Sequence, residues 1–385
     1  MLISTVRSKV FIIRSIAFGS QMFFALLLAA SPSRNPSFPP HLVGTTTAVS
    51  ELLERILPES SSHFIFTLAP ASSPDAANSF TLSDGPGGKI AITATTASEL
   101  TGGLGVYLRE YCGMTIGWER GGGTYVFTPS TWPTIGDGTK VTRSRSVPWS
   151  HVTQVCTHSY TLVWHDWEKW EHFIDWMALA GHNSIVAPKG QEEVQYKVFT
   201  EQFNVSDIDA RNWTNGPAWL TWSRGQNSHG NGIGGPLPRS YMKGQWALQR
   251  QILARYRELG IAGHLPAFGG YAPWALAVAQ NASQHDPLIA RGVKAATDTA
   301  WIDGRDPLYT QVADAWMKEI LADFGSDHGV CMFALQYCFV CVFVCSVLFL
   351  LTSRSLALPP HQSGKWMLSS RTALAGARRA PLKRS

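Results

Sequence analysis

Residues 167–187 read WEKWEHFIDWMALAGHNSIVA, and this stretch decides the fold class. Four of its apolar side chains have the i, i+3, i+4, i+7 spacing of one helix face: Trp170, Phe173, Ile174 and Met177. Gly181 predicts the end of that helix, and the apolar run 184–187 is typical of a short buried strand. A helix joined to a buried strand by a short turn is the unit of helix-covered parallel sheets.

The same alternation continues on both sides of this stretch. It predicts strands at 152–156 and 261–268 and helices at 192–199, 248–259 and 308–320. We expect the strands to be neighbours and parallel. Helices this amphipathic favour a (β/α)8 barrel, and a doubly wound sheet is the alternative. A closed barrel takes about 250 residues, whereas the pattern runs only from 149 to 328, so the predicted barrel is incomplete.

Residues 43–148 predict a small α/β domain ahead of the barrel. The pattern gives helices at 49–57 and 100–111 and strands at 63–68, 80–82 and 89–93. The glycine-rich run 85–88 predicts a hairpin turn between the last two strands. It is not a nucleotide-binding phosphate loop, because that motif needs Ser or Thr after its lysine, and Ile90 follows Lys89.

The composition fits a folded protein, with 45% hydrophobic and 15% charged residues. The net charge of +5 comes from residues 352–385, which hold seven Lys and Arg and no Asp or Glu. No nucleic-acid partner is predicted, because the rest of the chain has no basic excess. Only Cys112 and Cys156 precede residue 329, so the sequence predicts neither a disulfide scaffold nor a metal site. No oligomeric state is predicted.

The first residues resemble a targeting segment. Basic residues are followed by an apolar run ending near Ala30, which predicts a signal peptide over 1–30, with an N-terminal anchor as the alternative. Residues 31–42 are a Ser/Pro-rich linker. Three sequons predict glycosylation at Asn204, Asn212 and Asn281. The expected location is therefore the secretory pathway, lysosomal or extracellular.

Residues 329–385 have a different character from the rest of the chain. The segment 330–351 contains no charge and is long enough to span a bilayer, and the cations after it would leave the C-terminus in the cytosol. One interpretation is a type I membrane-anchored protein. The other is that 329–385 is translated from non-coding or wrong-frame sequence, which the abrupt loss of the barrel pattern favours.

Several ordered blocks of sequence carry a resemblance to a known family. They are 84–88 (DGPGG), 107–113 (YLREYCG), 154–160 (QVCTHSY), 163–167 (VWHDW), 174–181 (IDWMALAG), 190–192 (GQE), 217–222 (PAWLTW), 235–238 (GPLP) and 265–268 (LPAF). Over residues 43–328 the chain resembles the α-N-acetylglucosaminidase family, glycoside hydrolase family 89.

The resemblance implies a small α/β domain, a (β/α)8 barrel and then a large helical domain. It implies a retaining exo-glycosidase that removes terminal α-linked N-acetylglucosamine, with heparan sulfate as the animal lysosomal substrate, and no metal ion or organic cofactor. Such an enzyme uses two carboxylates, one as acid/base and one as nucleophile, about 5–5.5 Å apart.

Four residues are candidates for contact with the sugar. In the family the cysteine matching Cys156 lies beside the bound sugar, and Trp222 matches an aromatic residue of the sugar site. Gln154 stands where the family usually has Asn. Glu192 follows the end of a predicted strand. It either orients a pocket residue or only places a negative charge at a helix start, where such a charge is stabilising.

The chain departs from the family after residue 328. The family continues into a strand that ends in an Asn-Glu pair whose glutamate is the acid/base, but here no Asp or Glu follows Asp327. The 385-residue polypeptide is therefore predicted to be inactive, although its family is an enzyme family. The alternative function is that of a non-catalytic carbohydrate-binding or membrane-anchored remnant.

Overall fold

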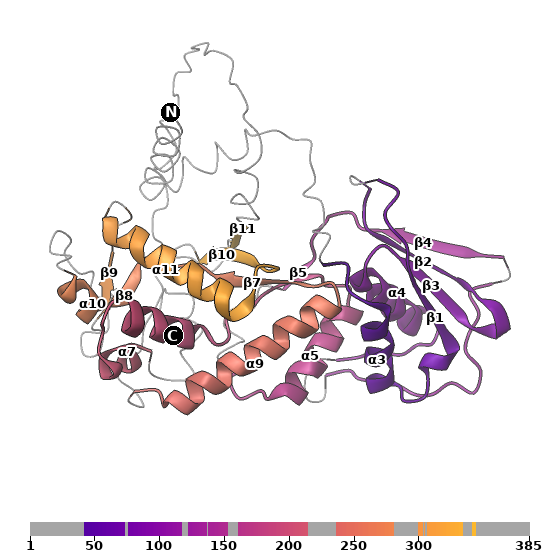
Figure 1. Ribbon diagram of the computed structural model, residues 1–385. Coiled ribbons are helices and arrows are strands. Elements are labelled where there is room, and N and C mark those ends of the chain that lie inside the picture. Colours follow the sequence, from indigo (N-terminus) through magenta and orange to yellow (C-terminus); the bar gives the residue numbers. More distant parts are fainter. Residues whose placement is uncertain are drawn as a thin grey trace, which may run out of the picture. The chain divides into compact units, whose positions relative to one another are not determined.

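The structure is a computed structural model (Figure 1) that describes residues 42–73, 76–117, 122–136, 138–152, 161–214, 236–280, 299–302, 304, 306–333 and 341–343. The predicted signal peptide, the linker up to residue 41 and the basic tail lie outside these residues. Among the described helices, none is long and apolar enough to cross a membrane.

The N-terminal domain is built on a four-stranded sheet. Its strands are β1 (Phe64–Leu68), β2 (Ser79–Asp84), β3 (Ile90–Ala94) and β4 (Lys140–Ser144), in the order β1-β3-β2-β4. β3 is parallel to β1 and antiparallel to β2, which also pairs antiparallel with β4. The predicted turn is present at 85–88, where Gly87 has φ +68° and Gly88 has φ +72°, conformations that favour glycine.

Two helices cover this sheet, α3 (Thr46–Ile56) and α4 (Ala97–Glu110). Each begins after a threonine whose hydroxyl accepts from a backbone N–H in the first turn: Thr45 from Ala48 at 3.1 Å and Thr96 from Glu99 at 3.2 Å. Their apolar sides form a core with the sheet that includes the fully buried Leu52, Leu53, Leu82, Ile92, Leu100 and Leu104. The predicted small α/β domain is confirmed.

The second part of the chain contains the predicted parallel sheet. β5 (His151–Val152), β6 (Ser184–Val186), β7 (Ala262–Pro266) and β10 (Gly329–Phe333) lie side by side in that order, each parallel to its neighbour. The predicted adjacency of the three strand segments is therefore confirmed where they are described, and residues 153–156 of the first lie outside the described residues. The described residues thus contain four parallel strands, half the number of a closed (β/α)8 barrel, and the barrel they form is incomplete.

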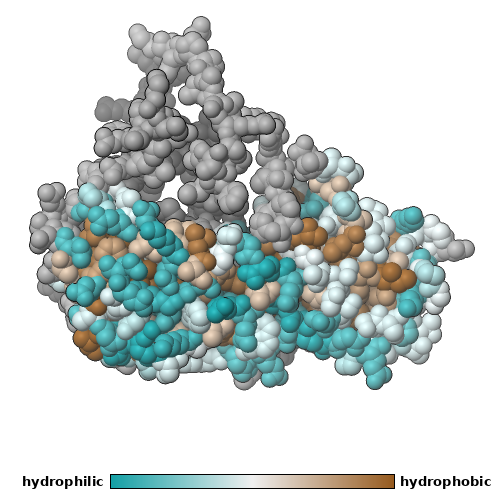
Figure 2. Space-filling view, viewed as in Figure 1, coloured by the Kyte–Doolittle hydropathy of each residue, from teal (hydrophilic) through white to brown (hydrophobic). Residues whose placement is uncertain are grey.

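Helices connect these strands at the predicted positions, with one unpredicted addition at 207–213 and an earlier start, at Arg239, for the helix predicted at 248–259. They are α5 (Trp167–Leu179), α6 (Gln191–Lys197) with a π-helical turn at Val198–Gln202, α7 (Asp207–Trp213), α9 (Arg239–Glu258) and α11 (Pro307–Phe324). Figure 1 shows α9 and α11 running along the sheet, and in Figure 2 the surface over them is mostly hydrophilic. Their buried residues, such as Ile252 and Trp316, form the stripe that meets the strands.

In the described part of the barrel, a short antiparallel pair interrupts the alternation after β7. A short antiparallel pair, β8 (Tyr271–Pro273) and β9 (Thr299–Trp301), and the helix α10 (Trp274–Ala279) lie between β7 and α11. The sequence analysis did not predict this pair, because strands of three residues are too short to show a period.

The end of the described chain differs from the predicted boundary at residue 328. Residues 329–333, placed in the tail by the sequence analysis, form β10, and β11 (Cys341–Phe343) pairs antiparallel with it. Parallel pairing uses backbone groups, so it does not require the family's side chains. The described parts of the uncharged segment 330–351 are these strand residues, and its remainder lies outside the description.

The small domain contacts the barrel helix α5 closely. A Cβ atom at Gly105 of α4 would collide with the backbone carbonyl of Leu179, so glycine is required there. Arg109 donates to the same carbonyl at 2.9 Å. Arg55 of α3 forms two hydrogen bonds, of 2.8 and 2.7 Å, with the buried carboxylate of Asp175.

Candidate active site at the carboxyl end of the barrel strands

Three of the four predicted sugar-contact residues lie outside the described residues: Gln154, Cys156 and Trp222. The fourth, Glu192, is described, as are the sequon residues Asn204 and Asn212, whereas Asn281 is not. At the carboxyl ends of β6 and β7, where barrel enzymes hold their chemistry, the described residues include a group of buried polar side chains.

Glu192 lies in the first turn of α6, directly after β6. Gly190 precedes the helix with φ +73°, and a Cβ atom there would lie 2.8 Å from the Cα atom of Trp246 on α9, so the turn requires glycine. Glu192 is 0% exposed. A carboxylate placed only to favour a helix start would lie in solvent, so its burial leaves it as a candidate for orienting a pocket residue.

The side chain of Lys189, between β6 and α6, is almost completely buried, and the residue is 1% exposed. Its ammonium group donates to the side-chain carbonyl of Gln245 at 2.7 Å and lies 5.7 Å from the ring centre of Trp170. Gln249, one helical turn further along α9, donates to the backbone carbonyl of Ala187 at 2.9 Å. Two polar side chains of α9 therefore fix the backbone and the cation at the end of β6.

Gln191 stands out in this group because its amide is completely buried. Among the residues that the structure describes, neither the Oε1 nor the Nε2 atom of Gln191 has a hydrogen-bond partner. A buried unsatisfied amide costs about 1–3 kcal/mol. Such a group at the carboxyl end of a barrel strand is a candidate for hydrogen bonding to a ligand.

Glu193 faces a different environment from Glu192. Arg239, the first residue of α9, donates to its two carboxylate oxygens at 2.5 and 2.7 Å, and the same guanidinium lies 3.4 Å from the ring centre of Tyr196. The side chain of Glu193 is 4% exposed. This bidentate ion pair positions the start of α9 against α6. Glu193 therefore has a structural role.

The inner face of the sheet carries two histidines bridged by a serine. The opposite face meets α9, because a Cβ atom at Gly263 would lie 2.8 Å from a methyl carbon of Leu253. Ser184 Oγ lies 2.7 Å from His151 Nδ1 and 2.8 Å from His264 Nε2. The hydroxyl has one proton, so at most one of the two ring nitrogens accepts from it, and the other ring donates its N–H to Oγ.

Both histidines are kept neutral by their surroundings. Burial, together with the nearby His182, lowers the pKa of His151 to about 4. Burial also lowers the pKa of His264 to about 3, with smaller contributions from His151 and His328. These neutral side chains suit a structural layer inside the barrel. Among the described residues, no group of three or more His, Cys, Asp or Glu is arranged to hold a metal ion.

This bridge makes stability depend on pH in a predictable direction. Below about pH 6.5 the unfolded chain binds protons on His151 and His264, whereas the folded chain binds them only near the lowered pKa values of about 4 and 3. Stability is therefore full above about pH 6.5 and falls as the pH decreases towards 4. Between pH 6.5 and 5 each histidine is expected to reduce the free energy of unfolding by about 1.5 kcal/mol.

Urea unfolding at pH 7 and pH 5 measures this effect. His264→Gln retains a side chain that can bond to Ser184 but cannot take up a proton, so its loss of stability between the two pH values should be smaller than that of the wild type. An equal loss of stability in both proteins would contradict the assignment of this pH dependence to His264.

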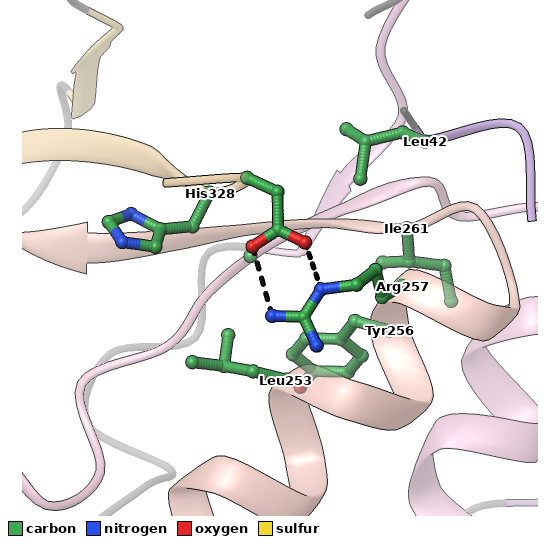
Figure 3. A pocket seen from close by; sticks show the side chains of 8 residues that line it. Leu42, Leu253, Tyr256, Arg257, Ile261 and His328 are labelled. Carbon is green, nitrogen blue, oxygen red and sulfur yellow. Dashed lines mark hydrogen bonds and ion pairs between the residues drawn. The ribbon is translucent and has the colours of Figure 1, made fainter. Parts of the chain in front are cut away.

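A small crevice lies at the other end of the sheet, where α9 ends and β10 begins (Figure 3). Its volume of about 10 Å³ holds no more than one water molecule. Arg257, which points into it, forms a bidentate ion pair with Asp327, with one hydrogen bond of 2.9 Å. This is the amino end of the strands, where side chains serve stability, so Asp327 has a structural role.

Sequence reasoning missed Lys189 and Gln191, although the latter lies inside the quoted GQE block. A weak signal was present, because four of the five residues 191–195 are polar or charged, and they follow a buried strand without the alternation of a solvated helix.

Two sequence comparisons decide the family. A model described as the alpha-N-acetylglucosaminidase (NAGLU) tim-barrel domain matches residues 151–334, and the model of the N-terminal domain of the same family matches residues 47–134. The chain belongs to the alpha-N-acetylglucosaminidase family. The match to the barrel model reaches residue 334 and thus includes β10.

Individual relatives agree with this assignment. Human alpha-N-acetylglucosaminidase is 29% identical over 264 residues, which are 65% of this chain and 33% of the human protein. The chain therefore spans about a third of the length of the curated relative it matches. The prediction that this chain resembles only the N-terminal part of the family's proteins is confirmed.

Solved structures of the family 89 glycoside hydrolase from Clostridium perfringens are similar in fold. One is a variant with two glutamates replaced by glutamine, in complex with its substrate GlcNAc-alpha-1,4-galactose; it is 25% identical, with a TM-score of 0.65, and covers 75% of this chain and 32% of that one. Another contains 2-acetamido-1,2-dideoxynojirmycin and is 26% identical, with a TM-score of 0.65 and the same coverage.

Proposed function

We propose that this protein provides the small domain and the first half of the barrel of a retaining exo-glycosidase that removes terminal α-linked N-acetylglucosamine from glycans such as heparan sulfate. The observation that supports this most is the buried polar group at the carboxyl end of β6, on a sheet whose parallel strands lie in chain order, as they do in a (β/α)8 barrel. A complex of the Clostridium perfringens enzyme with its substrate GlcNAc-alpha-1,4-galactose supports the proposed substrate class.

In the proposed mechanism, the groups that bind the sugar differ from the two carboxylates that cleave the glycosidic bond. The end of β6 contributes a buried amide at Gln191 and a buried carboxylate at Glu192, both suited to hold or orient polar groups of a sugar. Gln154, Cys156 and Trp222, which lie outside the described residues, would complete the sugar pocket. Protonation of the leaving oxygen and attack on the anomeric carbon need two carboxylates on opposite sides of the bond.

The test is hydrolysis by a polypeptide whose reading frame continues beyond residue 328 through the family's Asn-Glu segment. We expect it to cleave nitrophenyl α-N-acetylglucosaminide and to release the α-anomer first, as seen by proton NMR. Release of the β-anomer would contradict the retaining mechanism, and cleavage of other glycosides in preference would contradict the substrate class.

We also propose that the protein enters the secretory pathway, for a lysosomal or extracellular location. The sequons at Asn204 and Asn212 support this, because both asparagine side chains are exposed in the described structure. Asn204 follows the π-helical turn with φ +57°, and Asn212 lies on α7.

In a eukaryotic host we expect removal of the first 30 or so residues and a glycan on at least one of Asn204, Asn212 and Asn281. Intact-mass measurement before and after glycosidase treatment checks both, and Asn→Gln variants locate the glycan. Protein that retains residue 1 and carries no glycan would contradict the proposed route.

A further inference from the structure

Trp164 is an unusual surface residue. It is 68% exposed, the highest value among the exposed large apolar side chains that the structure describes. An indole in solvent loses the burial that makes aromatic residues stabilising. Its exposure is therefore more readily explained by a ligand than by packing.

The position of Trp164 in the barrel is informative. It lies in the loop between β5 and α5, and its nearest described aromatic partner is Tyr241, in the first turn of α9. The two rings meet edge to face, with centres 6.3 Å apart and planes at 74°. Since α5 and α9 each run back to the amino end of the next strand, both residues lie at the carboxyl end of the sheet, where barrel enzymes bind their substrates.

The residues that support Trp164 are held firmly in place. Next to Tyr241 along α9, Met242 is completely buried, and Arg239 is fixed by its two hydrogen bonds to Glu193 and by the ring of Tyr196. An aromatic side chain on such a base loses little conformational entropy when a ligand covers it.

We propose that Trp164, supported by Tyr241, is the stacking platform for the sugar on the leaving-group side of the cleaved bond. This inference rests on the proposed glycosidase function. The terminal N-acetylglucosamine would bind at the carboxyl ends of the strands, near Gln191. The sugar to which it is linked would then extend outward, towards the loops that follow the strands. The flat apolar face of an indole matches the C–H face of a pyranose ring.

Ligand binding to the full 385-residue chain tests the platform, with saturation-transfer NMR titrations of N-acetylglucosamine and of GlcNAc-α-1,4-galactose. Wild-type protein should bind the disaccharide more tightly than the monosaccharide. Trp164→Ala should weaken disaccharide binding about five- to tenfold, by analogy with aromatic stacking elsewhere, and leave N-acetylglucosamine binding unchanged. Trp164→Phe should recover most of the loss.

The matched control is Tyr125→Ala, which removes a 63% exposed aromatic side chain from the small domain and should change neither affinity. Melting curves confirm that each variant is folded. Unchanged disaccharide affinity in Trp164→Ala, or an equal loss for both sugars, would overturn the platform and leave the proposed function standing. Failure of the wild type to bind either sugar would overturn both.

Discussion

The purified 385-residue polypeptide is expected to release no nitrophenol from nitrophenyl α-N-acetylglucosaminide above the uncatalysed rate. No Asp or Glu follows Asp327 in the sequence, whereas the family's acid/base glutamate belongs to the segment after that position. General-acid help alone contributes about 10²–10⁴-fold, and loss of the nucleophile removes the covalent intermediate.

The structure gives this prediction a second basis. Asp327 is paired with Arg257 at the amino end of the sheet, away from the end where barrel enzymes react. At the carboxyl end, Glu193 is paired with Arg239, which leaves Glu192 as the buried candidate after β6. One carboxylate cannot supply both roles of a retaining glycosidase.

The assay compares the wild type, Glu192→Gln and a polypeptide that continues through the Asn-Glu segment. We expect activity only from the last of these. Binding of the ground state by the remaining pocket residues does not lower the barrier. Turnover by the 385-residue wild type that disappears in Glu192→Gln would show that the chemistry resides in the described half of the barrel.

Arg55→Met is expected to lower the free energy of unfolding by about 3 kcal/mol. The side chain of Asp175 is 3% exposed, and both of its oxygens accept hydrogen bonds from Arg55. Burial raises the pKa of Asp175, and the Arg55 guanidinium opposes that effect. Removing one partner of a buried pair leaves an uncompensated charge, which costs about 3–5 kcal/mol, and the lower value applies because Arg55 is 25% exposed.

Urea unfolding followed by tryptophan fluorescence measures the loss. Arg143→Met is the matched control, because its partner Glu110 and Arg143 itself are both 46% exposed; an exposed pair contributes about 0–1 kcal/mol. The double variant Arg55→Met, Asp175→Leu should recover part of the loss, since it removes the buried charge as well. Equal losses of stability in Arg55→Met and Arg143→Met would show that the burial of Asp175 does not determine how much the ion pair contributes.

Much of the fold could be predicted from local pattern. The stripe of Trp170, Phe173, Ile174 and Met177 became α5, with Gly181 just beyond its end, and the apolar run at 184 became β6. These elements follow from side-chain period and from glycine's backbone freedom, which act within a few residues. The hairpin at 85–88 was predictable for the same reason.

The candidate site was predicted less completely. Glu192 was found through its place after a strand, but the burial of Gln191 and Lys189 depends on α9, where Gln245, the partner of Lys189, lies 56 residues further along the chain. Likewise, the pairing of Arg55 with Asp175 joins residues 120 positions apart. Spacing along the chain carries no information about such pairs.

The sequence by itself determined the family, the order of helices and strands, and the absence of carboxylates after Asp327, because each is written in neighbouring residues or in ordered blocks. Only the tertiary structure decided which polar groups are buried. It placed His151, Ser184 and His264 in one hydrogen-bonded row and Trp164 against Tyr241 at the carboxyl end. Burial and partnership arise from contacts between distant segments, and these are fixed only when the strands pair and the helices pack on them.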